Sequence, residues 1–217
     1  RQMMGYEEVP HWRSTSVEGH ENRLVLTYAG GGRPLVLLEG RMHAYEGFDL
    51  SEMQLSERTL AAWGVEGVIL TSAAGAVSPA LKAGDVLVAH AVLDLQHRPP
   101  GEAPPLLSAL DPRLRRCLHT WAGDKPWFKV GVHATVPGPH YETAADLRLL
   151  RHLGADSVSM SLAAELRAAQ EEGLYCAAVA VIANAGPPTH DEVLTGAVSA
   201  GDRLAQVVDA LLACGLR

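Results

Sequence analysis

The segment from Gly40 to Gly47 carries three side chains that suit an oxyanion, namely Arg41, His43 and Tyr45. If the chain is extended here, alternate residues point to the same face, so the three side chains face one ligand together. A guanidinium group offers a fork of donors that matches phosphate. A solvated edge strand with an ion pair explains the same pattern. The segment by itself does not decide between the two.

Ser161 places a hydroxyl group at the expected start of a helix over residues 161–172. A serine in that position most often caps the helix by accepting a bond from its first N–H groups. The same helix start also presents free N–H groups and the positive end of a dipole, which together bind anions. Both a helix cap and an anion site remain open for Ser161.

Glu142 and Asn184 could together recognise a heterocycle. Glu142 follows the turn Gly138-Pro139-His140-Tyr141, and Asn184 closes an apolar strand, where an unpaired amide is costly. A carboxylate accepts from ring N–H groups, and an amide donates and accepts at once. Glu142 also fits the role of an acid at a helix N-terminus.

Composition excludes several other classes of function. The net charge is −7 and the pI is near 5.8, with no basic run, so the chain lacks the charge that binds a nucleic-acid backbone. The longest apolar run, residues 174–185, is too short to span a bilayer, and no signal peptide is visible. No Cys/His spacing indicates a metal site, and neither a P-loop nor a GxSxG motif is found. We expect a cytoplasmic protein that binds a small molecule.

The three cysteines, Cys117, Cys176 and Cys214, have no CxxC spacing and are odd in number. This pattern favours reduced cytosolic thiols that partly fill the core.

The order of elements predicts an α/β fold, with a mixed, mostly parallel central sheet flanked by helices. Residues 1–22 read as a loop, and residues 23–29 and 34–39 form a hairpin around Gly30-Gly31-Gly32. Further strands are expected at 67–71, 86–93, 129–136 and 175–183, and helices at 51–63, 108–121, 143–153, 161–172 and 191–213. Thr143 and Asp146 form a capping box. The alternation favours one domain over residues 1–217.

Five motifs along the chain resemble, in this order, those of the trimeric purine nucleoside phosphorylases. They are Gly40-Arg41-Met42-His43-Ala44-Tyr45-Glu46-Gly47, Thr71-Ser72-Ala73-Ala74-Gly75, Gly138-Pro139-His140-Tyr141-Glu142-Thr143, Gly154-Ala155-Asp156-Ser157-Val158-Ser159-Met160-Ser161 and Thr189-His190-Asp191-Glu192-Val193. Each motif alone is weak evidence, but five in register over nearly the whole chain are specific.

The resemblance implies phosphate-dependent cleavage of purine (deoxy)ribonucleosides to the free base and (deoxy)ribose 1-phosphate, without a metal or organic cofactor. It assigns phosphate binding to His20, Arg41, His43, Ala73 (through its backbone) and Ser161. It assigns the ribose to Tyr45, His133, Met160 and His190, and the base to Tyr141, Glu142, Asn184 and Val193. The residues expected to act in catalysis are Asn184, Glu142, His43 and His190. It also implies a homotrimer.

Asparagine rather than aspartate at position 184 resembles the branch of the family that acts on 6-oxopurines such as inosine and guanosine. The other readings are a catalytically weak homologue that only binds nucleosides, and a phosphorylase for another nucleoside such as methylthioadenosine. Asn184 argues against the last of these.

The chain departs from the family pattern at several positions. Ser72, Ser159, Leu162 and Ala183 stand where the family usually has asparagine, glycine, threonine and threonine, and His133 replaces a tyrosine. The family's N-terminal strand and Gly-Ser-Gly loop, which donates to phosphate, have no counterpart before Arg1. These differences bear on phosphate binding and on the packing of the base.

Overall fold

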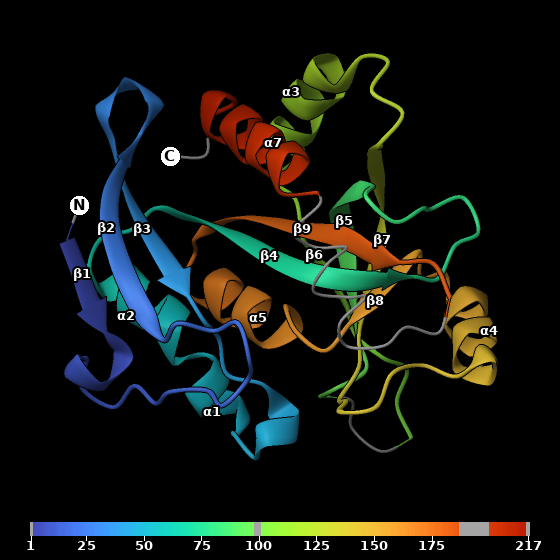
Figure 1. Cartoon of the computed structure of the whole chain (residues 1–217), viewed down its shortest axis with the longest axis horizontal. Helices are drawn as coiled ribbons and strands as arrows, with labels where there is room; N and C mark the ends of the chain where they lie inside the picture. Colours follow the sequence, from blue (N-terminus) through green and yellow to red (C-terminus); the bar gives the residue numbers. More distant parts are fainter. Residues whose placement is uncertain (1, 98–100, 187–199, 216–217) are drawn as a thin grey trace.

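A computed structural model describes residues 2–97, 101–186 and 200–215 of the chain (Figure 1). A small antiparallel sheet has the order β1-β2-β3, with β1 at Gln2–Gly5, β2 at Arg23–Ala29 and β3 at Arg33–Glu39. The predicted hairpin is confirmed, and its glycine-rich tip (η2, Gly30–Gly32) includes Gly31 at φ 78°. The expectation of a loop over residues 1–22 is wrong for β1, because this strand obtains its hydrogen bonds from β2 rather than from any local pattern.

The second sheet has six strands in the order β6-β5-β7-β8-β4-β9. An extra pairing between β5 and β9 closes β5, β7, β8, β4 and β9 into a ring, with β6 outside it beside β5. The strands are β4 (Gly67–Ala76), β5 (Val86–Asp94), β6 (Leu106–Ser108), β7 (Phe128–Thr135), β8 (Ser157–Ser159) and β9 (Tyr175–Asn184). The two long pairings, β4 with β9 and β5 with β7, are parallel. The pairings of β6 with β5 and of β8 with β4 are antiparallel. The predicted mixed α/β sheet is confirmed.

Helices cover this sheet from two sides (Figure 1). They are α1 (Leu50–Met53), α2 (Leu55–Ala62), α3 (Pro112–Ala122), α4 (Ala144–His152), α5 (Ala163–Glu171) and α7 (Gly201–Ala213), with short 3-10 turns η1 (Tyr6–Glu8) and η3 (Ala44–Glu46). The helix predicted at 51–63 is divided at Gln54, which caps both halves. The helix predicted at 191–213 is described only from Gly201, so its residues 191–199 lie outside the described residues.

The alternation of buried side chains along β9 separates two parts of the core. Ala178, Ala180 and Ile182 pack with α5 on one face, while Ala177 and Val179 pack with α3 and α7 on the other. Both sets are fully buried, as expected for a strand with helices on both of its faces. The carboxyl ends of β4 and β9 are thereby held side by side, and Gly75 and Asn184 meet in register.

Residues 157–162 differ from the sequence-based expectation. Ser157–Ser159 form strand β8, between β7 and β4, where no strand was expected. The helix begins later, with Leu162 rather than Ser161 in the N-cap position, and Leu162 has a φ of 95°. By contrast, the capping box of Thr143 and Asp146 at the start of α4 is confirmed. A three-residue strand that depends on two distant neighbours leaves little local signal in the sequence.

Two of the three cysteines are joined, so the expectation of three reduced thiols is wrong. Cys117 in α3 forms a disulfide with Cys214 directly after α7, across 97 residues of sequence, with the Cα atoms 5.7 Å apart. Cys176 is free and buried. The pairing depends on the packing of α3 against α7, which cysteine spacing does not show.

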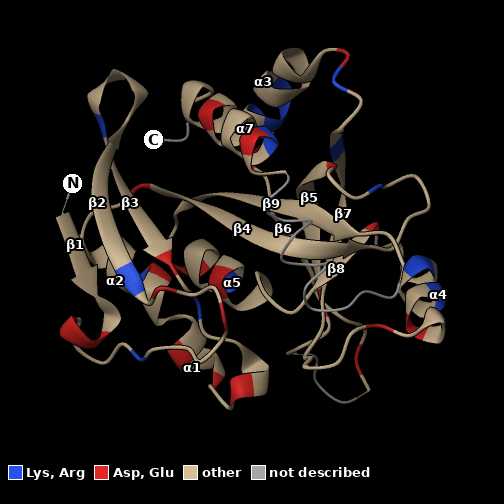
Figure 2. Cartoon of the chain, in the orientation of Figure 1, with Lys and Arg blue, Asp and Glu red and all other residues tan. Residues whose placement is uncertain are grey.

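Charged side chains are spread over many elements rather than collected in one place. Figure 2 shows acidic residues on η1, α1 and α5, and basic residues on α3 and α4. Among the described residues, no helix combines the length and the apolar character that crossing a bilayer requires.

Candidate active site

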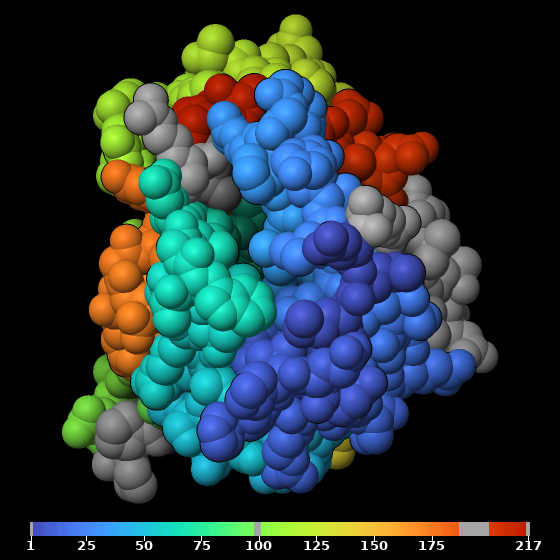
Figure 3. Space-filling view, turned by 90° about the vertical axis from the view of Figure 1, so that its left-hand side faces the viewer, coloured from blue at the N-terminus to red at the C-terminus, as the bar shows by residue number. Residues whose placement is uncertain are grey.

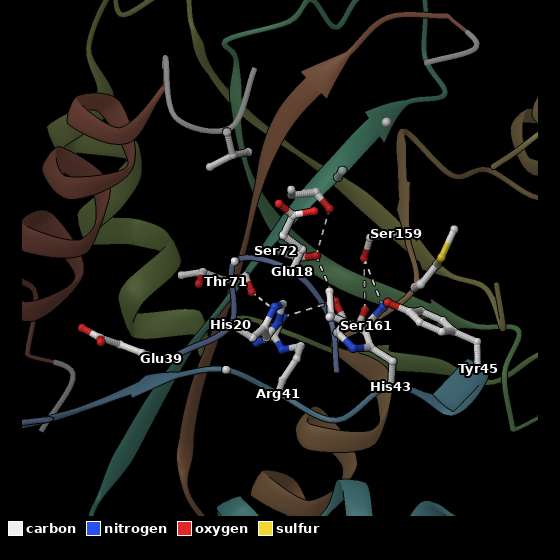
Figure 4. Close-up of a pocket in the computed structure, with 18 of the residues that line it drawn as sticks. Glu18, His20, Glu39, Arg41, His43, Tyr45, Thr71, Ser72, Ser159 and Ser161 are labelled. Carbon is white, nitrogen blue, oxygen red and sulfur yellow. Dashed lines mark hydrogen bonds between the residues drawn. The ribbon is translucent and has the colours of Figure 1, made fainter. Parts of the chain in front are cut away.

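A cavity of about 690 Å³ lies where the loop before β2, the segment after β3 and the carboxyl ends of β4 and β9 meet (Figure 4). Its volume is in the range of small-molecule sites. Ten of the residues predicted from the sequence line it together: His20, Arg41, His43, Tyr45, Ala73, Tyr141, Glu142, Met160, Ser161 and Asn184. They come from segments up to 164 residues apart in the chain, between positions 20 and 184.

Arg41 stands at the centre of one side of the cavity (Figure 4). Its guanidinium group donates to the carbonyl of Thr71 and to Ser161 Oγ, the latter at 3.2 Å. Glu165 of α5 forms an ion pair with it at 3.0 Å. Because the side chain is only about a fifth exposed, these contacts fix the direction of the remaining donors.

His43 is held by Glu46 at the wall of the same cavity. Its Nδ1 lies 3.2 Å from Glu46 Oε2, and its ring stacks on Tyr45 with centroids 4.9 Å apart. Burial, and then the charge of Arg41, lower the pKa of His43 to about 4, although Glu46 opposes the shift. Burial also raises the pKa of Tyr45 to about 12. Both side chains are therefore neutral near pH 7.

Glu46 is itself fixed as a carboxylate. Its oxygens accept from Thr15 Oγ1 at 2.7 Å and from the Ser16 amide at 2.8 Å. Burial acts to raise the pKa of Glu46, but hydrogen bonds from Ser16, Thr15 and His43 outweigh it, so the pKa falls. An ionised carboxylate can only accept, so the proton of the His43–Glu46 contact belongs to His43 Nδ1. The neutral ring then has a bare Nε2.

His20 adds a second imidazole beside His43, with the two ring centroids 5.4 Å apart. Burial, followed by the charge of Arg41, lowers the pKa of His20. Two neutral imidazoles and one guanidinium group therefore border this part of the cavity. The extended conformation that we expected at 41–45 is only partly found, because Ala44–Glu46 form a 3-10 turn.

The other side of the cavity contains Glu142 and Asn184. Asn184 Nδ2 donates to the carbonyl of Gly186 at 2.6 Å, which orients the amide. A Cβ atom added to Gly75 would lie 3.5 Å from both terminal atoms of that amide, so Gly75 and the Asn184 side chain are direct neighbours. Burial, opposed by its own backbone N–H, raises the pKa of Glu142. The Tyr141 pKa is likewise raised by burial.

Three of the predicted site residues are not placed in this cavity. His133, expected beside the ribose, is fully buried behind the wall, between Ser157 Oγ and Ser159 Oγ at 2.9 Å each. Its predicted contact with the ribose is corrected on this ground, since a side chain with no exposure cannot line a cavity. His190 and Val193 lie outside the described residues.

Sequence reasoning did not find Thr15 or Glu165 as parts of the site, and it named Ser72 only as part of a motif and as a departure from the family pattern. Ser72 Oγ lies 3.0 Å from Ser161 Oγ, and Glu165 is the counterion of Arg41. Glu46 was recognised only as part of a motif, although its position three residues after His43 is a usable signal for the pair that they form. Thr15 lies in a loop without a recognisable pattern. Among the described residues, no group of three or more His, Cys, Asp or Glu side chains fits a metal ion.

A second cavity of about 760 Å³ lies between β3 and the α2–β4 segment, where Figure 3 shows a hollow in the surface. Its lining is mostly apolar but includes Glu57 and Glu165. Glu57 is only 3% exposed, and burial together with the charge of Glu165 raises its pKa to about 8.

The fold and the site thus define an α/β protein in which one cavity has Arg41 and two imidazoles on one side and a carboxyl group and an amide on the other. Comparison with known proteins is consistent with this. Residues 2–213 match the model of the phosphorylase superfamily. The chain is 32% identical to purine nucleoside phosphorylase of Bos taurus, over 98% of this chain and 81% of the relative. It is 36% identical to that of Mycobacterium tuberculosis, over 95% and 79% respectively.

A solved structure of a purine nucleoside phosphorylase is also similar to this chain. A schistosoma purine nucleoside phosphorylase in complex with hypoxanthine superposes with a TM-score of 0.85 and 26% identity, over 97% of this chain and 82% of that one. The chain therefore belongs to the purine nucleoside phosphorylase family within the phosphorylase superfamily.

Proposed function

We propose that the protein is a purine nucleoside phosphorylase that cleaves 6-oxopurine (deoxy)ribonucleosides with inorganic phosphate. The observation that carries this proposal is the meeting of Arg41, His43 and Ser161 with Glu142 and Asn184 in a single cavity. The first three side chains suit an oxyanion, and the last two suit a purine edge. Membership of the family supports the same activity.

Phosphate would bind beside Arg41, His43, His20, Ser161 and the backbone of Ala73, all of which line the cavity. Arg41 and Ser161 supply donors. His43 has its proton on Nδ1, held by Glu46, so its Nε2 would accept from the hydroxyl group of the phosphate dianion. A bound dianion is then placed to attack C1′ of the sugar without a covalent enzyme intermediate.

The base would lie against Tyr141, with Glu142 accepting from N1–H and Asn184 bonding to N7 and O6. As the glycosidic bond breaks, negative charge develops on the purine and positive charge on the sugar. An oriented amide donor stabilises the first charge, and the phosphate dianion beneath the sugar stabilises the second. Glu142 has an elevated pKa but requires its ionised form for this role, so its function improves as pH rises through that pKa.

Tyr45 and Met160 would border the ribose. Met160 Sδ and a Tyr45 ring carbon both approach within 3 Å of a Cβ atom built on Gly138, so the two side chains and this turn are in close contact. We retain His190 as a ribose-binding residue and Val193 as a base-binding residue from the family resemblance.

Asn184 supports preference for 6-oxopurines, because an amide N–H can donate to O6 or N7, whereas an aspartate at this position would repel both acceptors. The proposal further includes phosphate as the only co-substrate, no organic cofactor, a single domain over residues 1–217, a homotrimer and a cytoplasmic location. The Cys117–Cys214 disulfide is unusual for that location, where most thiols are kept reduced.

The test is to incubate the protein with inosine or guanosine, with and without phosphate, and to measure the free base and the sugar 1-phosphate. Phosphate-dependent release of hypoxanthine or guanine is the expected result. Binding of nucleoside without release contradicts the proposal and leaves a nucleoside-binding protein. Much faster cleavage of methylthioadenosine than of inosine contradicts the role of Asn184 in specificity.

A further inference from the structure

A chain of buried polar side chains runs from β7 and β8 to the wall of the active-site cavity. His133 Nδ1 lies 2.9 Å from Ser157 Oγ, and His133 Nε2 lies 2.9 Å from Ser159 Oγ. His133 and Ser157 are fully buried, and Ser159 is 9% exposed and lines the cavity. The reaction proposed above uses neither His133 nor Ser159.

The hydrogen bonds in this series all donate in one direction, from Ser157 toward Ser161. Burial, and then the charge of Arg41, lower the pKa of His133 to about 3, so the ring is neutral and has one N–H group. With that proton on Nε2, the Ser157 hydroxyl donates to Nδ1, Nε2 donates to Ser159, and Ser159 donates to the Ser161 carbonyl at 3.2 Å. With the proton on Nδ1, the buried hydroxyl of Ser157 has no acceptor among the described residues. Since an unpaired buried donor is costly, we assign the proton to Nε2.

The chain ends on the backbone of a strained turn. Ser159 Oγ lies 3.4 Å from the Ser161 amide as well as 3.2 Å from its carbonyl, which also accepts from Thr135 Oγ1 at 2.8 Å. The next residue, Leu162, is fully buried at a φ of 95°. A residue with a side chain is strained in this conformation, which persists only where the surrounding structure holds it. The bonds to Ser161 are part of those surroundings.

Ser161 connects this turn to the charged side of the cavity. Its hydroxyl oxygen lies 3.2 Å from Arg41 Nη1 and 3.0 Å from Ser72 Oγ (Figure 4). A rotation of the Ser161 backbone would therefore move the Ser161 hydroxyl group, which suits an anion, and would remove a contact that orients Arg41.

We propose that His133 and Ser159 are positioning residues that hold the Ser161 turn so that Ser161 Oγ and Arg41 converge on phosphate. This inference rests on the proposed function for the identity of the anion. Removing the restraint weakens phosphate binding, and leaves the nucleoside half of the site, around Glu142 and Asn184, unchanged.

Two substitutions of the same residue separate positioning from simple packing. The amide of His133→Gln reaches the place of Nε2 and can still donate to Ser159, whereas the amide of His133→Asn reaches the place of Nδ1 and contacts only Ser157. Each variant loses one of two serine contacts and the same ring, so the two have similar effects on thermal stability. We expect phosphate affinity to fall about tenfold in His133→Asn, the loss for one hydrogen bond, and less than about threefold in His133→Gln.

A second pair of substitutions tests the same series of hydrogen bonds without changing the His133 ring. Ser159→Ala removes the link to Ser161 and should weaken phosphate binding about tenfold, whereas Ser157→Ala removes only the far end of the chain and should change it less than about threefold. This pair decides the question if the His133 variants do not fold.

The measurements are calorimetric titration with inorganic phosphate alone, the melting temperature, and the KM values for phosphate and for inosine. Equal phosphate affinity within each pair, or a fall in melting temperature without any change in affinity, overturns the proposal. Calorimetry needs no turnover, so wild-type protein that binds phosphate but releases no base refutes the proposed function and leaves this comparison valid. Wild-type protein that does not bind phosphate refutes the positioning role itself.

Discussion

Glu57 gives the protein a dependence of stability on pH that one substitution should remove. The carboxyl group is 3% exposed at the wall of the second cavity, and its neighbour Glu165 forms an ion pair with Arg41 at 3.0 Å. Burial and the Glu165 charge raise the Glu57 pKa from 4.5 to about 8. Between these values the folded protein binds a proton that the unfolded chain has lost.

The direction and size of the effect follow from this difference. Because the folded state binds more protons, the free energy of unfolding decreases as pH rises from about 4.5 to about 8, by up to about 1.4 kcal/mol per pH unit. Over the whole range from about pH 4.5 to about pH 8, the free energy of unfolding falls by at most about 5 kcal/mol. The adjacent cavity lets water approach the charge, so we expect roughly half of that, about 2–3 kcal/mol.

Glu57→Gln keeps the shape of the protonated side chain and cannot ionise. The variant should match the wild type near pH 5 and melt about 4–12 °C higher at pH 9, at about 2–4 °C per kcal/mol for a chain of this size. The assay is a series of melting curves between pH 5 and 9, with Glu171→Gln as the control. Glu171 is also a helical glutamate, but its side chain is 57% exposed and paired with Arg58.

The titration of His43 does not produce the same dependence of stability on pH. Burial lowers the pKa of His43 to about 4, so its contribution raises stability as pH increases up to about 6.5 and is then constant. It is common to both proteins and cancels in the difference between them. Parallel curves for the wild type and Glu57→Gln from pH 5 to 9 would refute the assignment of the raised pKa.

Three further predictions concern the site and the disulfide. Asn184→Ala should lower kcat/KM for inosine by about 10²–10³, because it removes an oriented donor facing the purine, and the rate of hypoxanthine release measures this. Burial raises the pKa of Glu142, so activity should fall on acidification through a value above the usual 4.5, and Glu142→Gln should abolish that limb of the pH–rate profile. Cys214→Ser should lower stability by up to about 4–5 kcal/mol, since the bond closes 97 residues, and melting curves measure the loss.

Each of these has a matched control. Gln2→Ala truncates an exposed amide in β1, outside the cavity lining, and should leave kcat/KM near the wild-type value. If the acid limb of the pH–rate profile persists in Glu142→Gln, that limb arises from a group other than Glu142. Thiol titration of the denatured, unreduced protein should give one reactive group in the wild type, Cys176, and two in Cys214→Ser. Three groups in the wild type would contradict the disulfide.

Much of the fold could be predicted from the chain because its signals are local. The glycines at 30–32 specify the hairpin tip, the Thr143 and Asp146 pair specifies the start of α4, and the continuous apolar run of β9 specifies a strand with both faces buried. Ten candidate site residues that line the cavity could be named because the family resemblance assigns them, eight of them within the quoted motifs.

Other features depend on partners that are distant in the sequence. β8 exists because β4 and β7 pair with it on either side, and Cys117 meets Cys214 because α3 packs against α7. No local pattern indicates that His133 lies between two serines behind the cavity wall, or that burial together with the charge of Glu165 raises the pKa of Glu57. Residue types and spacing named the chemistry of the cavity. Burial and the surrounding charges, which exist only after the chain has folded, set the protonation states and the directions in which those groups act.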